Sequence, residues 1–194
     1  MAKSSKQVVL ITGGAMGQGR THAVAFAKAG FDVVLIDMLE PENEIFKETI
    51  ELVRDAGGEV LPLQANICST PEVEAVFAQA WEAFGRLDVV VANAGIINFG
   101  YTWELSDEQV ERELAVNLEG TWRTDKYAAI YMRKQGYGRI INISSVSGLK
   151  GTAQLVTYCM TKFGIIGLTK TLALELQSEG LPIYCNVVCP TKVR

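Results

Sequence analysis

Tyr158 and Lys162 are the two residues whose types and spacing point most directly to chemistry. They stand four positions apart in a segment with helical periodicity, so both side chains lie on one face of the expected helix. An ammonium group close to a phenol stabilises the phenolate, which lowers the tyrosine pKa and makes the side chain a usable general acid or base. The same spacing occurs where a surface tyrosine stands beside a solvated lysine. The pair indicates a catalytic site only together with Ser145 and a glycine-rich turn.

The glycine-rich turn begins after Thr12 and carries glycines at positions 13, 14, 17 and 19. It directly follows a short apolar run and opens a helical pattern, which is the context that phosphate binding requires. Glycines let the backbone approach a pyrophosphate, and the amides and dipole of the helix N-terminus face its negative charge. A tight turn without a ligand is the alternative, because glycine is common in turns. The pattern favours a dinucleotide-binding turn.

Asp37 ends the second apolar run about 20 residues after this turn. A carboxylate there accepts hydrogen bonds from both hydroxyls of an adenosine ribose and repels a 2′-phosphate. Met16, Gln18 and Met38 nearby bring no positive charge that would compensate such a phosphate. We therefore expect NAD rather than NADP as cofactor, with a solvated strand-end aspartate as the alternative.

The segment Ala92-Asn93-Ala94-Gly95 follows the fourth apolar run. Its small residues suit a backbone that passes close to a bound ring, and the Asn93 side chain can tie neighbouring strand ends together. Taken alone, the segment is equally compatible with an ordinary loop.

Short β-branched apolar runs alternate with longer helical patterns along the chain, without an internal repeat or a low-complexity linker. This alternation predicts a parallel sheet covered by helices on both faces. Because crossovers between parallel strands are right-handed, we expect an α/β fold with a Rossmann-type doubly wound sheet and a single domain over residues 1–194. The expected strands are 8–12, 32–37, 59–64, 88–92, 138–144 and 182–188.

Glycines and capping residues mark the limits of the expected helices. Gly30 and Gly57 close the first two helices, whereas Ser69 and Ser106 open the third and fourth. The longest helical patterns cover 105–134 and 155–177.

Composition and charge restrict the range of functions. The chain of 194 residues is 48% hydrophobic, which suits a folded domain rather than a disordered segment. Its 18 Lys and Arg against 22 Asp and Glu give a net charge of -4 without a long basic block, so no nucleic-acid partner is expected. No apolar stretch approaches the roughly 18 residues needed to span a bilayer, so no membrane partner is expected either.

The four cysteines form no Cys-x-x-Cys pair, and the single histidine, His22, is distant from them in sequence. Neither a metal site nor a disulfide framework is therefore expected, and reduced thiols in the cytoplasm are the default. The position of His22 also argues against a serine hydrolase, because Ser145 would need a histidine base.

Taken together and in order along the whole chain, these motifs resemble the classical short-chain dehydrogenase/reductase family. The resemblance implies hydride transfer between a nicotinamide cofactor and a secondary alcohol or ketone. Tyr158 would protonate or deprotonate the substrate oxygen, and Ser145 would hydrogen-bond that oxygen as charge develops on it. Lys162 would hold the nicotinamide ribose and lower the Tyr158 pKa, and Asn117 would hold a water that links Lys162 to solvent. The residues that carry the resemblance are Thr12-Gly13 to Gly19, Asn93-Ala94-Gly95, Asn117, Ser145, Tyr158 and Lys162.

The same resemblance implies a larger set of cofactor contacts. Asn66 stands where the family usually has an aspartate that contacts adenine, and an amide can satisfy the same edge. The segment 17–24 together with Cys189-Pro190-Thr191 is similar to the carveol dehydrogenase-like subgroup, although the segment 38–46 is too short for the insertion that this subgroup carries. The expected cofactor contacts are Gly13, Met16, Gly17, Gln18, Gly19, Asp37, Asn66, Ile67, Asn93, Ala94, Gly95, Tyr158, Lys162, Pro190 and Thr191.

The resemblance also implies partners. In the family the two longest helices pair across a two-fold axis to form a dimer within a tetramer, so a homo-oligomer is expected here, although the apolar residues of these helices could equally be core. Ile96, Ile97, Phe99, Val146 and Leu149 near the expected pocket suggest an apolar small-molecule substrate.

Two further alternatives concern the end of the chain and the class of reaction. Family members run to about 250 residues, whereas this sequence stops at Arg194, so the C-terminal part with the seventh strand and the substrate lid is expected to be absent or to follow in an unseen tail. Without that part, binding of a dinucleotide without turnover is the alternative function. A methyltransferase also uses a glycine-rich first turn, but it has no need of Ser145, Tyr158 and Lys162.

Overall fold

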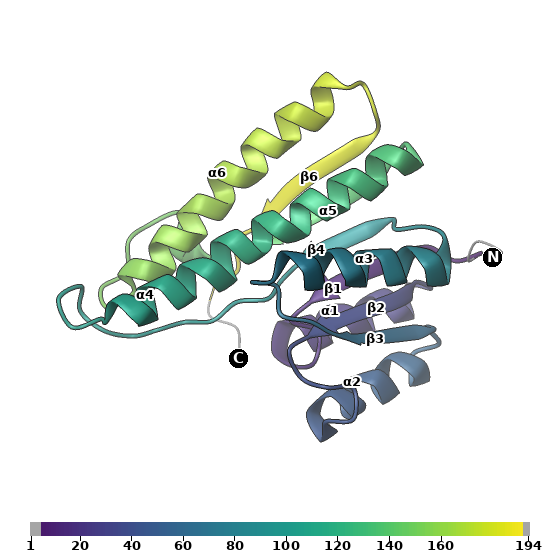
Figure 1. Cartoon of the computed structure of the whole chain (residues 1–194), viewed down its shortest axis with the longest axis horizontal. Coiled ribbons are helices and arrows are strands. Elements are labelled where there is room, and N and C mark those ends of the chain that lie inside the picture. The colour runs from purple at the N-terminus through teal and green to yellow at the C-terminus, as the bar shows by residue number, and fades with distance from the viewer. Residues whose placement is uncertain (1–4, 192–194) are drawn as a thin grey trace.

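Parallel strands form one sheet in the order β3-β2-β1-β4-β5-β6 (Figure 1). The computed structural model describes residues 5–191 of the chain. The strand order reverses between β1 and β4, which places a crevice at the carboxyl ends of the strands. The strands are β1 (Val8–Thr12), β2 (Asp32–Asp37), β3 (Val60–Gln64), β4 (Val89–Ala92), β5 (Gly138–Ile143) and β6 (Ile183–Val188).

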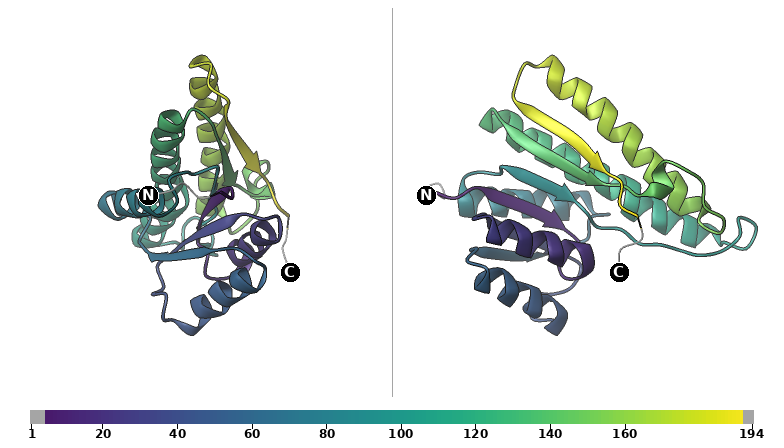
Figure 2. Two further views of the ribbon diagram at one scale, coloured as in Figure 1. Left: turned by 90° about the vertical axis from the view of Figure 1, so that its right-hand side faces the viewer. Right: turned by 180° about the vertical axis from the view of Figure 1, so that it is seen from behind.

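Helices cover both faces of this sheet, as the opposite views of Figure 1 and Figure 2 show. On one face, α1 (Gly17–Lys28) and α2 (Glu44–Asp55) pack against the sheet. On the other face lie α3 (Thr70–Phe84), α5 (Gly120–Gln135) and α6 (Val156–Ser178). The expected α/β fold with a doubly wound parallel sheet is confirmed.

The central strand β1 shows why the apolar runs form buried strands. Val8 and Leu10 belong to the core under α3, α5 and α6, whereas Val9 and Ile11 belong to the core under α1 and α2. All four side chains are fully buried. Because successive side chains point to opposite faces and both faces are covered, every position must be apolar. Each of the six strands lies within one residue of its predicted limits.

The expected helix over 105–134 is present without a break from Asp107 to Gln135, but it contains a π-helical segment that the sequence pattern did not predict. The chain forms α4 (Asp107–Leu114), then the π-helical segment Ala115–Glu119, then α5. Ser106 caps α4 as predicted, through a capping box with Gln109. In the wider turn, the Asn117 carbonyl accepts a hydrogen bond from the Thr121 hydroxyl at 2.7 Å. Insertions of this kind are frequent at functional sites.

Two further observations concern the surface of the described chain. Strand β6 forms one edge of the sheet, where Tyr184 is 53% exposed and Val188 is 47% exposed. Among the helices within residues 5–191, none combines the length and hydropathy needed to cross a membrane.

Candidate active site

A cleft of about 690 Å³ runs along the carboxyl ends of β1, β2, β3 and β4. Ten residues expected to contact a dinucleotide line it, namely Gly13, Met16, Gly17, Gln18, Asp37, Asn66, Ile67, Asn93, Ala94 and Gly95. Seven further residues line the cleft although they were not expected to contact a dinucleotide. They are Ile36, Met38, Leu39, Ala65, Ile96, Arg112 and Val116.

Glycine is required at two positions of the turn between β1 and α1. Gly13 has a φ of +64°, and a Cβ on it would lie 2.9 Å from the Cα of Ala94. A Cβ on Gly19 would collide with the carbonyl of Gly13. Gly19 is not among the residues that line the cleft. Its missing side chain lets the first turn of α1 pack directly against the Gly13 carbonyl.

The ends of β1 and β4 are tied together beside the turn. The Asn93 Nδ2 donates to the carbonyls of Thr12 at 3.0 Å and Gly13 at 3.2 Å. The Thr12 hydroxyl oxygen accepts from the backbone N–H groups of Asn93 at 3.1 Å and Ala94 at 3.2 Å. The expectation that Asn93 ties neighbouring strand ends is confirmed.

Asp37 stands at the end of β2 with its carboxylate fixed by backbone amides. Its Oδ2 accepts from the Ala15 N–H at 3.0 Å, and its Oδ1 accepts from the Leu39 N–H at 3.2 Å. A carboxylate oxygen has two lone pairs, so each oxygen retains capacity for another donor in the cleft.

Lys162 is buried on α6, with only 4% of the residue exposed. Its Nζ donates to the Ile143 carbonyl at the end of β5 at 2.8 Å and lies 5.4 Å from the ring centroid of Tyr158. Burial lowers the pKa of Lys162 to about 8, while the charges of Glu113 and Cys189 act in the opposite direction. The two side chains of the Tyr-x-x-x-Lys pair are thus brought together, as the spacing predicted.

The pKa of Tyr158 is raised above its ordinary value. Burial is the largest cause, the charges of Glu113 and Cys159 act in the same direction, and the Ser145 hydroxyl lowers the pKa. Burial of the phenol therefore prevails over the groups that favour the phenolate.

Asn117 lies in the π-helical segment and is fully buried. Its Oδ1 accepts from the Ile96 N–H and its Nδ2 donates to the Ile96 carbonyl, both at 2.8 Å. The same Nδ2 lies 3.3 Å from the Thr161 hydroxyl on α6. A Cβ on Gly95 would lie 3.3 Å from the Asn117 Oδ1 and 3.7 Å from the Lys162 Nζ. Asn117 and Lys162 therefore flank the backbone of Gly95 at the end of the cleft.

Ser145 directly follows β5, at the same edge of the sheet. Its Oγ accepts from the Ser147 N–H at 3.1 Å and so caps a short 3₁₀ turn. The Val146 N–H donates to the Pro190 carbonyl at 2.9 Å, which brings the segment after β6, with Thr191, beside Ser145. The lining residues do not include Ser145, Tyr158, Lys162, Pro190 or Thr191, so these residues adjoin the end of the cleft rather than its walls.

The sequence matches the profile of a family described as short chain dehydrogenase over residues 7–194. The chain belongs to the short-chain dehydrogenase family. Of this family's expected site residues, the structure brings Lys162, Tyr158, Asn117 and Ser145 together at the end of a glycine-built cleft. The resemblance predicted from the motifs is confirmed.

Relatives of this short-chain dehydrogenase include an NAD-dependent oxidoreductase of Mycobacterium tuberculosis H37Rv, 39% identical over 198 residues and covering 96% of this chain and 71% of that protein. The (-)-trans-carveol dehydrogenase of Rhodococcus erythropolis is 35% identical over 205 residues, covering 100% of this chain and 73% of the relative. The crystal structure of a carveol dehydrogenase from Mycobacterium avium in complex with NAD matches with a TM-score of 0.89 at 32% identity, covering 98% of this chain and 72% of that chain. This short-chain dehydrogenase is therefore similar in sequence and fold to dehydrogenases of the carveol type.

Proposed function

We propose that this enzyme transfers hydride between NAD and a secondary alcohol or ketone, with Tyr158 as the general acid and base. The observation that carries the proposal is the position of Lys162, which is buried, lies 5.4 Å from the Tyr158 ring and reaches the end of the cleft beside Gly95. Burying an ammonium group without a carboxylate in ion-pair contact costs free energy. Ionisable groups perturbed in this way cluster at functional sites.

The cleft fits a dinucleotide on the evidence of its own residues. Gly13 and Gly19 leave out side chains where the backbone is closely packed beside the cleft. The first turn of α1 contains no acidic residue, and its N-cap, Met16, makes no side-chain capping bond, so the amides there are left for an anion such as pyrophosphate. Asp37 would accept the adenosine ribose hydroxyls.

NAD is proposed over NADP because the residues next to the Asp37 carboxylate bring no cation. Met38 and Leu39 follow it, and Met16 and Gln18 line the same cleft. A 2′-phosphate would meet an uncompensated carboxylate at this position. NAD in the names of the relatives supports the same choice.

The chemistry requires one proton to move at the substrate oxygen. A bound nicotinamide supplies the site that accepts or donates hydride. Tyr158 in its phenol form donates its proton to a carbonyl oxygen, and as phenolate it accepts the proton of an alcohol. Because its pKa is not lowered, Tyr158 stays in the phenol form at neutral pH, which suits carbonyl reduction. Ser145 would donate a hydrogen bond to the same oxygen, and Lys162 in its charged form would stabilise the phenolate.

An apolar small molecule is the proposed substrate. Three residues expected at the pocket wall present hydrophobic side chains to solvent, with Ile97 44%, Phe99 68% and Leu149 64% exposed. Exposed apolar groups in the segments that follow β4 and β5 favour a substrate with a hydrophobic body and one hydroxyl or carbonyl.

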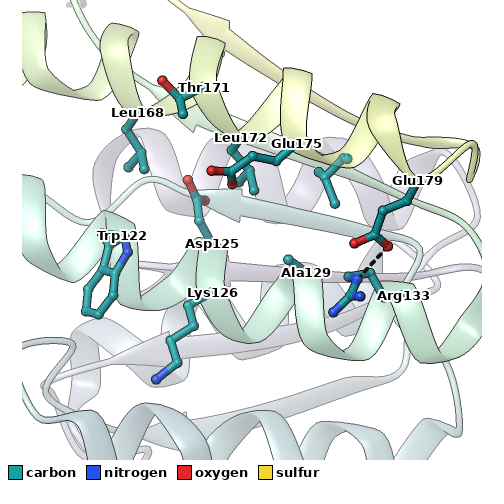
Figure 3. Close-up of a pocket in the computed structure, with 11 residues that line it drawn as sticks. Trp122, Asp125, Lys126, Ala129, Arg133, Leu168, Thr171, Leu172, Glu175 and Glu179 are labelled. Carbon is teal, nitrogen blue, oxygen red and sulfur yellow. Dashed lines mark hydrogen bonds and ion pairs between the residues drawn. The ribbon is translucent and has the colours of Figure 1, made fainter.

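A homo-oligomer is proposed through α5 and α6. Between these helices lies a cleft of about 370 Å³ with lining residues from both, and an ion pair of 2.7 Å between Arg133 and Glu179 joins them at one end (Figure 3). Trp122 is 48% exposed on this surface. A second copy would cover it.

The four free cysteines suit a reducing compartment, which supports a cytoplasmic location.

The proposal is tested with the purified protein, NAD or NADP, and a panel of apolar secondary alcohols and ketones. We expect turnover of at least one pair, faster with NAD than with NADP. Saturable NAD binding measured by calorimetry, with no turnover of any substrate above background, would instead favour the alternative of dinucleotide binding without catalysis. If the protein neither binds NAD nor turns over any substrate, the proposal is rejected.

A further inference from the structure

Glu113 on α4 carries a carboxyl group that the mechanism above does not use. The neighbouring Glu111 and Arg112 are exposed, whereas Glu113 is 0% exposed. Taking an ionisable group out of water costs free energy unless partners compensate for it. The contacts of Glu113 should therefore indicate what its burial achieves.

Asn98, in the segment after β4, supplies the hydrogen bonds of Glu113. The Asn98 N–H donates to Oε1 at 3.4 Å, and the Asn98 Nδ2 donates to Oε2 at 3.2 Å. The same Nδ2 donates to the Gln109 carbonyl at 3.2 Å, which fixes the orientation of the amide. Within residues 5–191, no basic side chain forms an ion pair with Glu113. The carboxyl group is thus oriented by an amide but not neutralised in direct contact.

Glu113 and Asn117 stand one helical turn apart and hold the same stretch of chain. Asn117 binds the backbone of Ile96, and Glu113 binds Asn98 two residues later. Asn117 in turn flanks Gly95 together with the Lys162 Nζ. Glu113 therefore belongs to the same buried polar cluster as Lys162.

The electrostatics agree with this geometry. The negative charge of Glu113 raises the pKa of Lys162 against the effect of burial, and it is the stronger of two groups that do so; the other is Cys189 after β6. Lys162 lowers the pKa of Glu113 in return, although burial dominates and raises it. Burial raises the pKa of Tyr158 on α6, and the charges of Glu113 and Cys159 act in the same direction.

We propose that Glu113 is a positioning residue of the Tyr158 site: its carboxylate keeps the Lys162 ammonium charged and, through Asn98, holds the segment after β4 beside that ammonium. The inference rests on the proposed function. A neutral Lys162 would no longer stabilise a phenolate on Tyr158. Glu113 thus sets the pH range over which the proposed general acid and base can work.

The experiment follows the ¹³Cε resonance of Lys162 across a pH titration of the full chain without cofactor, with the signal assigned by its loss in Lys162→Met. The wild type should titrate near pH 8, the value to which burial lowers the pKa. Glu113→Gln removes the charge at nearly constant volume and should lower the midpoint by roughly half a pH unit or more. Glu111→Gln removes an exposed carboxylate two positions away and should leave the midpoint unchanged.

A reciprocal titration keeps the inference falsifiable if Glu113→Gln does not fold. The ¹³Cδ resonance of Glu113 in the otherwise native chain should titrate at a higher pH in Lys162→Met, because a cation that favours the carboxylate has been removed. Unchanged midpoints in folded Glu113→Gln, or in Lys162→Met, would overturn the inference. Neither titration needs turnover, so an inactive protein with the expected shifts would contradict the proposed function and leave the role of Glu113 standing.

Discussion

Asn142 on β5 donates through its Nδ2 to the Oδ2 of Asp125 on α5 at 2.8 Å, and each residue keeps one oxygen without a partner. Both are buried, and Asp125 points from α5 into the space between α5 and α6 (Figure 3). Burial raises the pKa of Asp125 to about 7. A protonated Asp125 is thus the form that suits this environment.

The pH dependence of stability follows from that pair. Between about pH 4 and pH 7 the folded chain holds the Asp125 proton more tightly than the unfolded chain, so this group lowers the free energy of unfolding as the pH rises. Asp125→Asn keeps the acceptor for Asn142 and removes the charge that burial disfavours. We expect this variant to be more stable than the wild type at pH 8 by on the order of 2–4 kcal/mol. Its free energy of unfolding should also change less between pH 5 and pH 8.

Urea unfolding at pH 5 and pH 8 measures this difference. Asp55→Asn, which changes an exposed aspartate on α2, is the matched control and should keep the wild-type profile. An Asp125→Asn profile parallel to that of the wild type would contradict the assignment of the pH dependence to Asp125.

Gly19→Ala should abolish NAD binding, because the added methyl group collides with the Gly13 carbonyl and displaces the turn that lines the cleft. Gly151→Ala is the control, since a Cβ there meets nothing within 4 Å. Calorimetric titration with NAD checks both variants after circular dichroism has established that each is folded. Retained NAD affinity in folded Gly19→Ala would show that the turn does not hold the cofactor.

Asp37→Asn should narrow the preference for NAD over NADP. The amide oxygen still accepts a backbone N–H, but the negative charge that repels a 2′-phosphate is gone. We expect the ratio of the two dissociation constants to change by roughly tenfold in favour of NADP, which corresponds to about 1.4 kcal/mol. Asp55→Asn again serves as control, and an unchanged ratio in Asp37→Asn would remove the basis for the NAD preference.

Trp122→Glu should separate the copies of the proposed homo-oligomer, because it places a charge on the exposed surface of α5. Light scattering after size exclusion should show a lower mass than for the wild type. Leu52→Glu, on the exposed side of α2, should not change the mass. If the wild type is a monomer at micromolar concentration, the α5 and α6 surface is not an interface of this chain.

The strand positions could be predicted to within one residue because β-branched runs with both faces buried leave a strong local pattern. The cleft could be predicted for the same reason, since strand ends fix where Gly13, Asp37 and Asn93 lie. The π-helical segment at Asn117 could not be predicted, because no glycine or proline precedes it in the helix. The widened turn depends instead on tertiary contacts to Ile96.

The burial of Glu113 and the shifted pKa of Tyr158 could not be predicted from the sequence pattern either. Glu113 stands in the polar run of α4, and only the folding of the segment after β4 over this helix takes it out of solvent. The raised pKa of Tyr158 has the same origin, because spacing places Lys162 nearby but does not show that the phenol is buried. The i, i+4 spacing of Glu113 and Asn117 was the one sequence signal that could have drawn attention to the acid.

The most direct test of the proposed function compares NAD-linked turnover by the wild type with that of Tyr158→Phe, which removes only the phenol oxygen. Tyr184→Phe, on the exposed edge of β6, is the matched control and should keep full activity. We expect Tyr158→Phe to lose activity by roughly 10²–10⁴-fold while binding NAD as tightly as the wild type. Equal turnover by the wild type and Tyr158→Phe would contradict the assignment of Tyr158 as the general acid and base.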